Sequence, residues 1–116
     1  MKPFVSYELA LKLKEKRFDE PCLASYDEQQ VLIIEKRTAL EINTLLREWV
    51  LAPLYQQVID WFREKHFIWI HIDGSQHLKI VYVISHSKDL FKKHEQIEYS
   101  YYEALDKAIE EALKLI

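Results

Sequence analysis

Glycine is almost absent from this sequence, and its scarcity excludes several classes of enzyme. Gly74 is the only glycine. Phosphate-binding loops and dinucleotide fingerprints need several glycines at fixed spacings, and the nucleophile elbow of α/β hydrolases needs two beside its serine. None of these motifs can be present. We therefore expect a non-enzymatic protein with no catalytic residues and no cofactor.

Cysteine is equally scarce, since Cys22 is the only one. A lone cysteine cannot form an internal disulfide, which fits a reducing compartment. No cation or histidine adjoins Cys22 to activate its thiol, so we interpret it as a small core residue. The N-terminal residues 1–4 lack the apolar core of a signal peptide, and no stretch approaches the ~20 apolar residues of a membrane span. We expect a cytoplasmic protein without a membrane partner.

Strong charge of one sign is also lacking. The formal charge is −3, and residues 1–51 and 52–116 each carry 8 basic residues against 9 and 10 acidic ones. Proteins held to nucleic acid by their charge usually gather lysine and arginine on one surface. The Lys92-Lys93 pair is interpreted as part of a solvated loop. Nucleic acid is therefore not the expected partner.

Apolar side chains are abundant, at 49% of the 116 residues. A chain of this length can bury roughly two-thirds of its unfolded surface in one core. No internal repeat and no linker rich in proline or glycine divides it. We expect a single α+β domain over 1–116, with a helical and extended segment at 1–51 and a helix-strand-strand-strand-helix module at 52–116.

Two amphipathic helices are predicted in the N-terminal segment. Residues 6–17 have helical apolar spacing, with Ser6 as the N-cap. Thr38 and Glu41 form a capping-box pattern ahead of a helix at 39–49. Two short β-prone segments lie between these helices, at 22–26 and 31–35.

The C-terminal module is predicted to begin with a helix at 52–66, because Pro53 suits the first helical position. From Phe67 the apolar period changes to two, which indicates a strand. Gly74 supplies a turn into a second strand, and the register that keeps the isoleucines on one face pairs Ile72 with Leu78, Ile70 with Ile80 and Ile68 with Tyr82. A polar loop at 85–95 then leads to a short third strand at 96–99. A capping box of Ser100 and Glu103 starts the last helix, in which Ala104, Ala108 and Ala112 form a ridge of small residues.

Both faces of this predicted sheet are apolar enough to need a cover. Helices 52–66 and 100–116 can cover the isoleucine face. The opposite face is a candidate interaction surface, since an apolar patch of this kind is normally buried or functional. It comprises Phe67, Trp69, His71, Lys79, Val81 and Val83. Two alternatives remain open, namely that residues 1–50 pack on this face or that it meets a second copy of the chain or another protein.

The five histidines fall at positions 66, 71, 77, 86 and 94. Their spacing matches no helical pair of metal ligands and no cysteine–histidine zinc pattern. We interpret them as solvated or aromatic-packed imidazoles and expect no metal site. The acidic residues of the last helix fit a solvated helix face better than a pair of catalytic carboxylates.

The order of elements in the module matches double-stranded RNA-binding domains. Those domains carry lysines at the start of the last helix, whereas here the helix begins Ser100-Tyr101-Tyr102-Glu103. An acid at a helix N-terminus occupies the place where a phosphate would bind. RNA binding therefore rests on fold analogy alone.

Three stretches resemble one known family. They are residues 6–22, residues 52–66 with Gln57-Val58-Ile59-Asp60-Trp61-Phe62, and residues 102–116 with Ala108-Ile109-Glu110-Glu111-Ala112-Leu113. They resemble a family of small uncharacterised proteins from Bacteroides-type gut bacteria and their phages and mobile elements, in which many members have glycine at the position of Arg17. The similarity is lowest over residues 28–50. The resemblance implies a genomic setting and no mechanism.

The function that these observations favour is an accessory protein that acts through protein contacts, with self-association as a homodimer or another protein as the partner. A nucleic-acid-binding module is the alternative.

Overall fold

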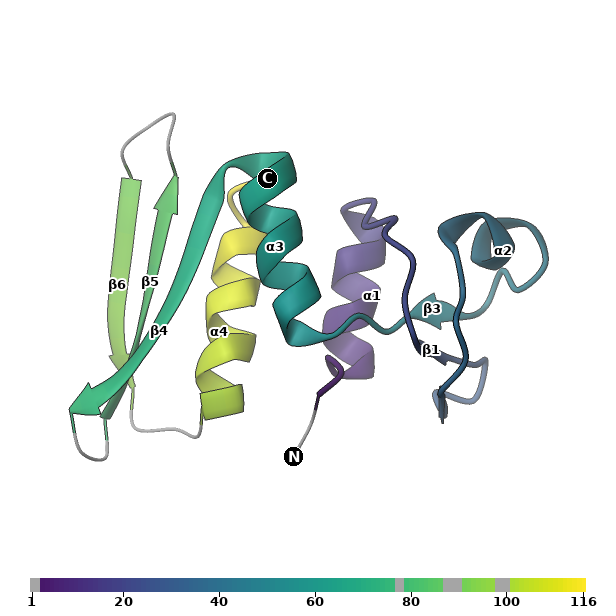
Figure 1. Cartoon of the computed structure of the whole chain (residues 1–116), viewed down its shortest axis with the longest axis horizontal. Coiled ribbons are helices and arrows are strands. Elements are labelled where there is room, and N and C mark those ends of the chain that lie inside the picture. Colours follow the sequence, from purple (N-terminus) through teal and green to yellow (C-terminus); the bar gives the residue numbers. More distant parts are fainter. Residues whose placement is uncertain (1–2, 77–78, 87–90, 98–100) are drawn as a thin grey trace. The chain divides into compact units, whose positions relative to one another are not determined.

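The computed structural model describes residues 3–76, 79–86, 91–97 and 101–116, with side chains for 3–71 and 101–116. Contacts within the chain group into two compact units, Met1–Tyr55 and Gln56–Ile116. The boundary lies four residues after the predicted division at 51 and 52. Figure 1 shows the elements of both units along the chain.

The first unit begins with the predicted amphipathic helix, α1 (Tyr7–Glu15). The Ser6 hydroxyl accepts a hydrogen bond from the Leu9 amide at 3.2 Å, which confirms Ser6 as the N-cap. Leu9, Ala10 and Leu13 form the buried face of the helix. After the C-cap, Arg17 takes a left-handed conformation with φ 65°. This conformation ends the helix at a position that glycine usually occupies.

A small antiparallel sheet follows, with strand order β2-β1-β3. Its strands are β1 (Ser25–Tyr26), β2 (Leu32–Ile33) and β3 (Val50–Leu51). Strands β1 and β2 lie within the two predicted β-prone segments, whereas β3 was not predicted. Tyr26 connects β1 to the segment before α1, because its hydroxyl donates a hydrogen bond to the Val5 carbonyl at 2.6 Å. Burial, with a smaller contribution from the Glu8 charge, raises the pKa of Tyr26 above its usual 10.0.

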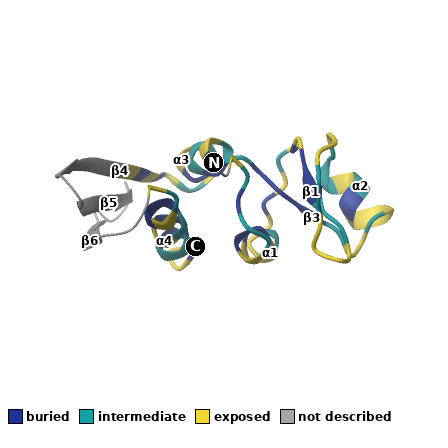
Figure 2. Cartoon of the chain, turned by 90° about the horizontal axis from the view of Figure 1, so that it is seen from below, coloured by how far each residue is buried: buried dark blue, intermediate teal, exposed yellow. Residues whose placement is uncertain are grey.

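Helix α2 (Ala39–Thr44) is shorter than the predicted 39–49. Its capping box is confirmed, with the Thr38 side chain bound to the Glu41 amide and the Glu41 side chain bound to the Thr38 amide. Ile42 is its one buried residue, while Leu45 is 79% exposed. Leu45 therefore packs against little, although Leu46 and Trp49 are half-buried, and the chain leaves the helix at Leu45. Figure 2 shows this outward exposure of α2 beside the buried strands β1 and β3.

Helix α3 (Tyr55–His66) begins later than predicted, and the assignment of Pro53 to its first position is wrong. The segment before the helix is extended and belongs to the first unit. The Ala52 amide donates to the Ala24 carbonyl at 3.0 Å, and the Pro53 carbonyl accepts from the Val5 amide at 3.0 Å. These bonds need an extended backbone, and a residue before proline disfavours the helical region.

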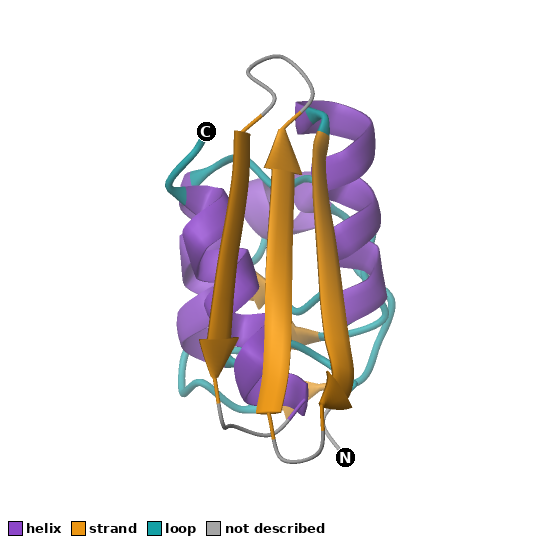
Figure 3. Ribbon diagram, turned by 90° about the vertical axis from the view of Figure 1, so that its left-hand side faces the viewer, coloured by secondary structure: helices purple, strands orange, loops and turns teal. Residues whose placement is uncertain are grey.

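The second unit contains the predicted antiparallel sheet, with strand order β4-β5-β6. Its strands are β4 (Ile68–Gln76), β5 (Lys79–His86) and β6 (Phe91–Ile97). Helices α3 and α4 (Tyr101–Leu113) lie side by side against one face of this sheet (Figures 1 and 3). The α+β class and the three-stranded antiparallel sheet are confirmed.

The predicted register of the hairpin is wrong by four residues. Ile72 pairs with Tyr82, Ile70 with Ile84 and Ile68 with His86. Gly74 lies inside β4, at the irregularity between Asp73 and Gln76, and not in the turn. The closing pair is Gln76 with Lys79, so the connection falls at positions 77 and 78, outside the described residues. A shift of an even number of residues keeps each residue on its predicted face, and the longer pairing adds ladder hydrogen bonds.

The third strand also differs from its prediction. The predicted loop at 85–95 contains most of β6, in which Lys92 pairs with Ser85 and His94 with Val83. Lys92 and Lys93 therefore belong to a strand and not to a loop. The predicted residues Tyr99 and Ser100 of the third strand and the second capping box lie outside the described residues.

Helix α4 packs against β4 and β5 in the second unit. Ala104, Ala108 and Ala112 are fully buried, which confirms the predicted ridge of small residues. The core between helices and sheet is completed by larger side chains, namely Val58, Trp61, Phe62, Ile68, Leu105 and Ile109. Lys65 is exposed, although its helical spacing from Val58, Trp61 and Phe62 would place it on the buried side of α3. Within the described residues no helix is long and apolar enough to cross a membrane.

Candidate functional site

Successive residues of strand β4 belong to opposite faces of the second sheet. Ile68 is fully buried and Ile70 is 9% exposed on the side of α3 and α4. Trp69, at the position between them, is 44% exposed, and Phe67, the residue before the strand, is 48% exposed. Figure 3 looks onto the side of the sheet opposite the two helices. The predicted separation of an isoleucine side from an aromatic side is thus present in β4.

The remaining residues of the predicted surface are aligned by the strand register. Val83 stands opposite His71, and Val81 stands opposite Asp73. Lys79 pairs with Gln76 at the end of the hairpin. Directly opposite residues of an antiparallel pair belong to the same face. The backbone therefore brings the positions of His71, Val81 and Val83 together beside Trp69, with Lys79 at the far end.

Phe67 has a feature that the sequence pattern did not indicate. It follows the last residue of α3 and has φ 57°, in the left-handed region. A residue with a Cβ atom is strained there by roughly 1 kcal/mol, and glycine is the usual choice after a helix. An exposed phenylalanine at this position adds apolar surface at the expense of backbone strain. The only indication of this strained conformation in the sequence is that no glycine stands between the helical pattern and the strand pattern.

Side chains are described for two of the five histidines, His66 and His71. His66 packs edge-on against Trp61, with 4.6 Å between ring centroids, and His71 is exposed on β4. Among the described residues no three His, Cys, Asp or Glu side chains gather as metal ligands. His77 lies outside the described residues. Cys22 is buried, as predicted, and its thiol donates to the Glu20 carbonyl at 3.3 Å.

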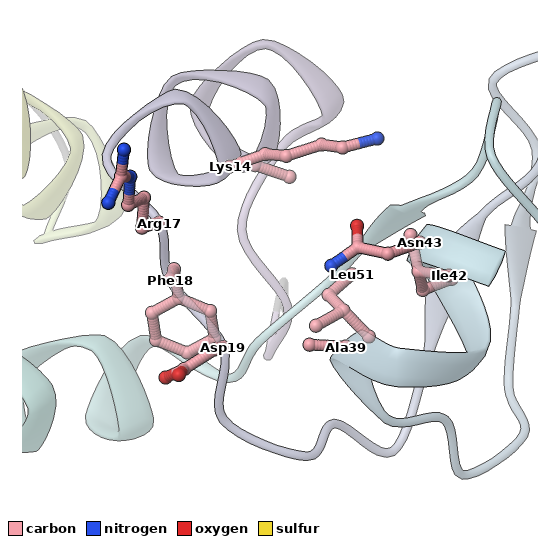
Figure 4. A pocket seen from close by; sticks show the side chains of 9 residues that line it. Lys14, Arg17, Phe18, Asp19, Ala39, Ile42, Asn43 and Leu51 are labelled. Carbon is pink, nitrogen blue, oxygen red and sulfur yellow. The ribbon is translucent and has the colours of Figure 1, made fainter.

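A cavity of about 320 Å³ lies within the first unit, between α1, α2 and β3. Its apolar lining includes Ala10, Ile42 and Leu51, and its polar lining includes Lys14, Arg17, Asp19 and Asn43. Figure 4 shows that the charged ends of Lys14, Arg17 and Asp19 point in different directions. No acid and base converge there, so this lining does not form a catalytic pair.

Lys14 has a structural role at the rim of this cavity. Its side-chain amine donates to the main-chain carbonyls of Arg47 at 3.3 Å and Trp49 at 3.2 Å. These carbonyls lie in the irregular segment between α2 and β3. The ammonium group therefore ties that segment to α1, which reduces its availability for a ligand.

Arg37 anchors the other end of the first unit. Its guanidinium pairs with Glu41 at 3.2 Å and Glu35 at 3.0 Å, and lies 5.7 Å from the centroid of the Trp49 ring. The hydrogen bond from Arg37 lowers the pKa of Glu41 below its usual 4.5, with smaller contributions from Thr38. All these groups serve the capping box and the loop beside it. Their arrangement is that of a structural cluster.

Comparison with protein-family models, curated proteins and solved structures finds no match to this chain. The candidate site therefore rests on the geometry of the chain itself. Of the two features described, the aromatic side of β4 is the one whose exposure the packing of its own unit does not explain.

Proposed function

We propose that this is a non-enzymatic accessory protein that acts through protein contacts, and the exposure of Trp69 carries the proposal. Tryptophan is the residue most enriched among side chains that dominate binding energy at protein interfaces. Trp69 leaves 44% of its surface exposed in the regularly paired part of β4. Phe67, the residue before β4, is a second exposed ring, with 48% of its surface exposed.

The packing of β4 favours a binding surface at Trp69. The neighbouring residues Ile68 and Ile70 are fully and nearly buried on the other side of the strand, and this packing anchors the backbone that presents Trp69. A rigid aromatic side chain loses little conformational entropy when it is covered by a partner. The surface proposed is the one predicted from the sequence, namely Phe67, Trp69, His71, Lys79, Val81 and Val83.

The experiment that tests the proposal is Trp69→Glu, with the oligomeric mass measured by light scattering during gel filtration. We expect the wild-type chain to self-associate and the variant to be a folded monomer. Loss of the aromatic anchor should weaken association at least about tenfold, the equivalent of 1.4 kcal/mol.

Tyr101→Glu is the matched control, because Tyr101 is 49% exposed but lies at the start of α4. This variant should associate like the wild type. Circular dichroism separates loss of contact from loss of fold. A chain that unfolds on Trp69→Glu has Trp69 in its core, and that result contradicts the proposal.

The setting proposed for this function is the cytoplasm of a bacterium, in a protein of phage or mobile-element origin. It is supported by the lone cysteine and by the family resemblance of residues 6–22, 52–66 and 102–116.

A nucleic-acid-binding module is the second candidate, favoured by the order α3-β4-β5-β6-α4, which double-stranded RNA-binding domains share. Such domains recognise the shape and phosphates of the duplex. Here Glu103 stands in the first turn of α4. A fluorescence-anisotropy titration with a duplex RNA of about 16 base pairs tests this candidate. Binding that weakens with salt supports it, and no binding even at low salt removes it.

A further inference from the structure

The second sheet has two edges, and their sequences differ. Within the described residues β4 and β6 each pair with β5 alone. Strand β6 reads Phe91-Lys92-Lys93-His94-Glu95-Gln96-Ile97 and contains three residues charged at neutral pH. Strand β4 runs for nine residues from Ile68 to Gln76 and contains one, Asp73. Neither strand contains proline.

This difference bears on what can pair with each edge. An edge strand presents unpaired N–H and C=O groups, and soluble proteins protect such edges with lysine, other charges or proline. The lysine pair of β6 is a protection of this kind. The ladder of β4 is regular from Ile68 to Asp73, and the first five of these residues carry no lysine, arginine, aspartate or glutamate. Strand β4 is therefore the edge that the sequence leaves open to another strand.

We propose that a second copy of this chain pairs antiparallel with the free edge of β4, so that two three-stranded sheets join into one sheet of six strands. The inference rests on the proposed function and names the partner of the same surface. Two-fold symmetry requires the strand to be complementary to itself.

The sequence of β4 meets this requirement when Ile70 lies on the two-fold axis. In that register Ile70 faces its own copy, and Ile68 faces Ile72 of the partner subunit. Trp69 then lies directly opposite His71 of the partner subunit, so an indole and an imidazole form a cross-strand pair twice. Aromatic cross-strand pairs of this kind stabilise antiparallel sheets. The register uses only the regular part of the β4 ladder and avoids the irregularity that begins after Asp73.

The joined sheet would place the two Trp69 side chains on one continuous outer face. The exposed aromatic area would then be partly covered at the junction, and the remaining area would be doubled.

The test is disulfide trapping of the full chain in a Cys22→Ala background. Ile70→Cys should form a symmetric intermolecular disulfide, because residues directly opposite in an antiparallel pair have Cα atoms about 5 Å apart. Ile68→Cys is the matched control on the same strand and the same buried side. Its own copy would lie four residues away along the strand, about 13 Å, which is beyond disulfide reach.

Hydrogen exchange on the unmutated chain keeps the inference testable if Ile70→Cys does not fold. Raising the protein concentration should slow exchange in a peptide covering Ile68–Asp73 at least tenfold more than in one covering β6. Cross-linking of Ile70→Cys but not Ile68→Cys, together with this protection, supports edge pairing.

A dimer that loses association on Trp69→Glu but shows neither the cross-link nor the protection overturns edge pairing while leaving the proposed function standing. In such a dimer the two sheets would pack face to face, about 10 Å apart, too far for the disulfide. A wild-type chain that is monomeric at every concentration also overturns edge pairing. Unfolding of Trp69→Glu, by contrast, overturns the proposed function itself.

Discussion

The indole N–H of Trp49 donates a hydrogen bond to the Glu28 carboxylate, with 2.6 Å between the nitrogen and the oxygen. Trp49 lies in the irregular segment before β3, and Glu28 lies in the turn between β1 and β2. The Arg37 guanidinium lies over the same indole ring. A single aromatic side chain thus fastens three segments of the first unit that have little regular structure between them.

Removing this donor should destabilise the first unit. Trp49→Phe keeps an aromatic ring for Arg37 but loses the N–H, and we expect the free energy of unfolding to fall by about 1 kcal/mol. Glu28→Gln should cost less, because its amide oxygen still accepts a hydrogen bond. Urea unfolding of both single variants and the double variant measures the coupling between the two side chains. Glu48→Gln is the control. A coupling energy between Trp49 and Glu28 that is no larger than the change in unfolding free energy caused by Glu48→Gln would contradict the prediction.

Arg17→Gly should stabilise the protein. Arg17 has φ 65° at the end of α1, where a Cβ atom is strained and glycine is not. We expect the free energy of unfolding to rise by about 1 kcal/mol, measured by urea unfolding. Lys16→Gly is the matched control, because Lys16 has φ −95° and gains nothing from glycine. A loss of stability in both variants would show that the Arg17 side chain matters more than its backbone.

Phe67→Gly should separate stability from association. Glycine relieves the left-handed strain at φ 57°, so the chain should become more stable by about 1 kcal/mol. The same change removes an exposed ring from the proposed surface, so association should weaken. Phe67→Ala removes the ring but retains the Cβ atom, and should weaken association without the gain in stability. Thermal unfolding and gel filtration of the two variants test both parts.

Stability should fall at acidic pH, in part through Glu41. The hydrogen bond from Arg37 lowers the pKa of this carboxyl in the folded chain below its usual 4.5. A carboxyl with a lowered pKa stabilises the fold above its unfolded value, and that contribution is lost as the pH falls through the folded value. Glu41→Gln should therefore narrow the difference in urea midpoint between about pH 7 and about pH 3. An unchanged difference, with Glu48→Gln as the reference, would contradict this assignment.

The presence of the helices and the caps of α1 and α2 were accessible from the sequence, because they are specified locally, whereas the end of α2 and the start of α3 depend on tertiary packing. Ser6 caps α1 and the Thr38–Glu41 pair caps α2, as their spacing predicted. The strands were less accessible. Strand β3 is two residues long and exists only because Ser25 and Tyr26 pair with it. No periodic pattern can develop over two residues, so only tertiary pairing defines that strand.

The errors in the second unit have a common cause, because strand pairing overrides the local preference of the residues for a turn or a loop. Gly74 was assigned to a turn because glycine favours turns, yet pairing on both sides of it holds it within β4. The polar sequence of β6 was assigned to a loop, because an edge strand can be polar on both sides. The shared face predicted for the positions of His71, Val81 and Val83 depended only on residue alternation, which a register error of four residues leaves unchanged. The strain at Phe67 needed backbone angles, which no pattern of residue types provides.

The alanine ridge of α4 sets a limit on how this protein can evolve. Ala104, Ala108 and Ala112 are each fully buried in the second unit. A valine or leucine at any of them adds volume to an interior that is already filled, and overpacking costs typically 1–3 kcal/mol. We therefore expect replacements at these sites to be confined to residues no larger than serine, and exposed positions of the same helix to vary more freely. As the sequence of α4 diverges, small side chains at every fourth residue should therefore be its best-preserved feature.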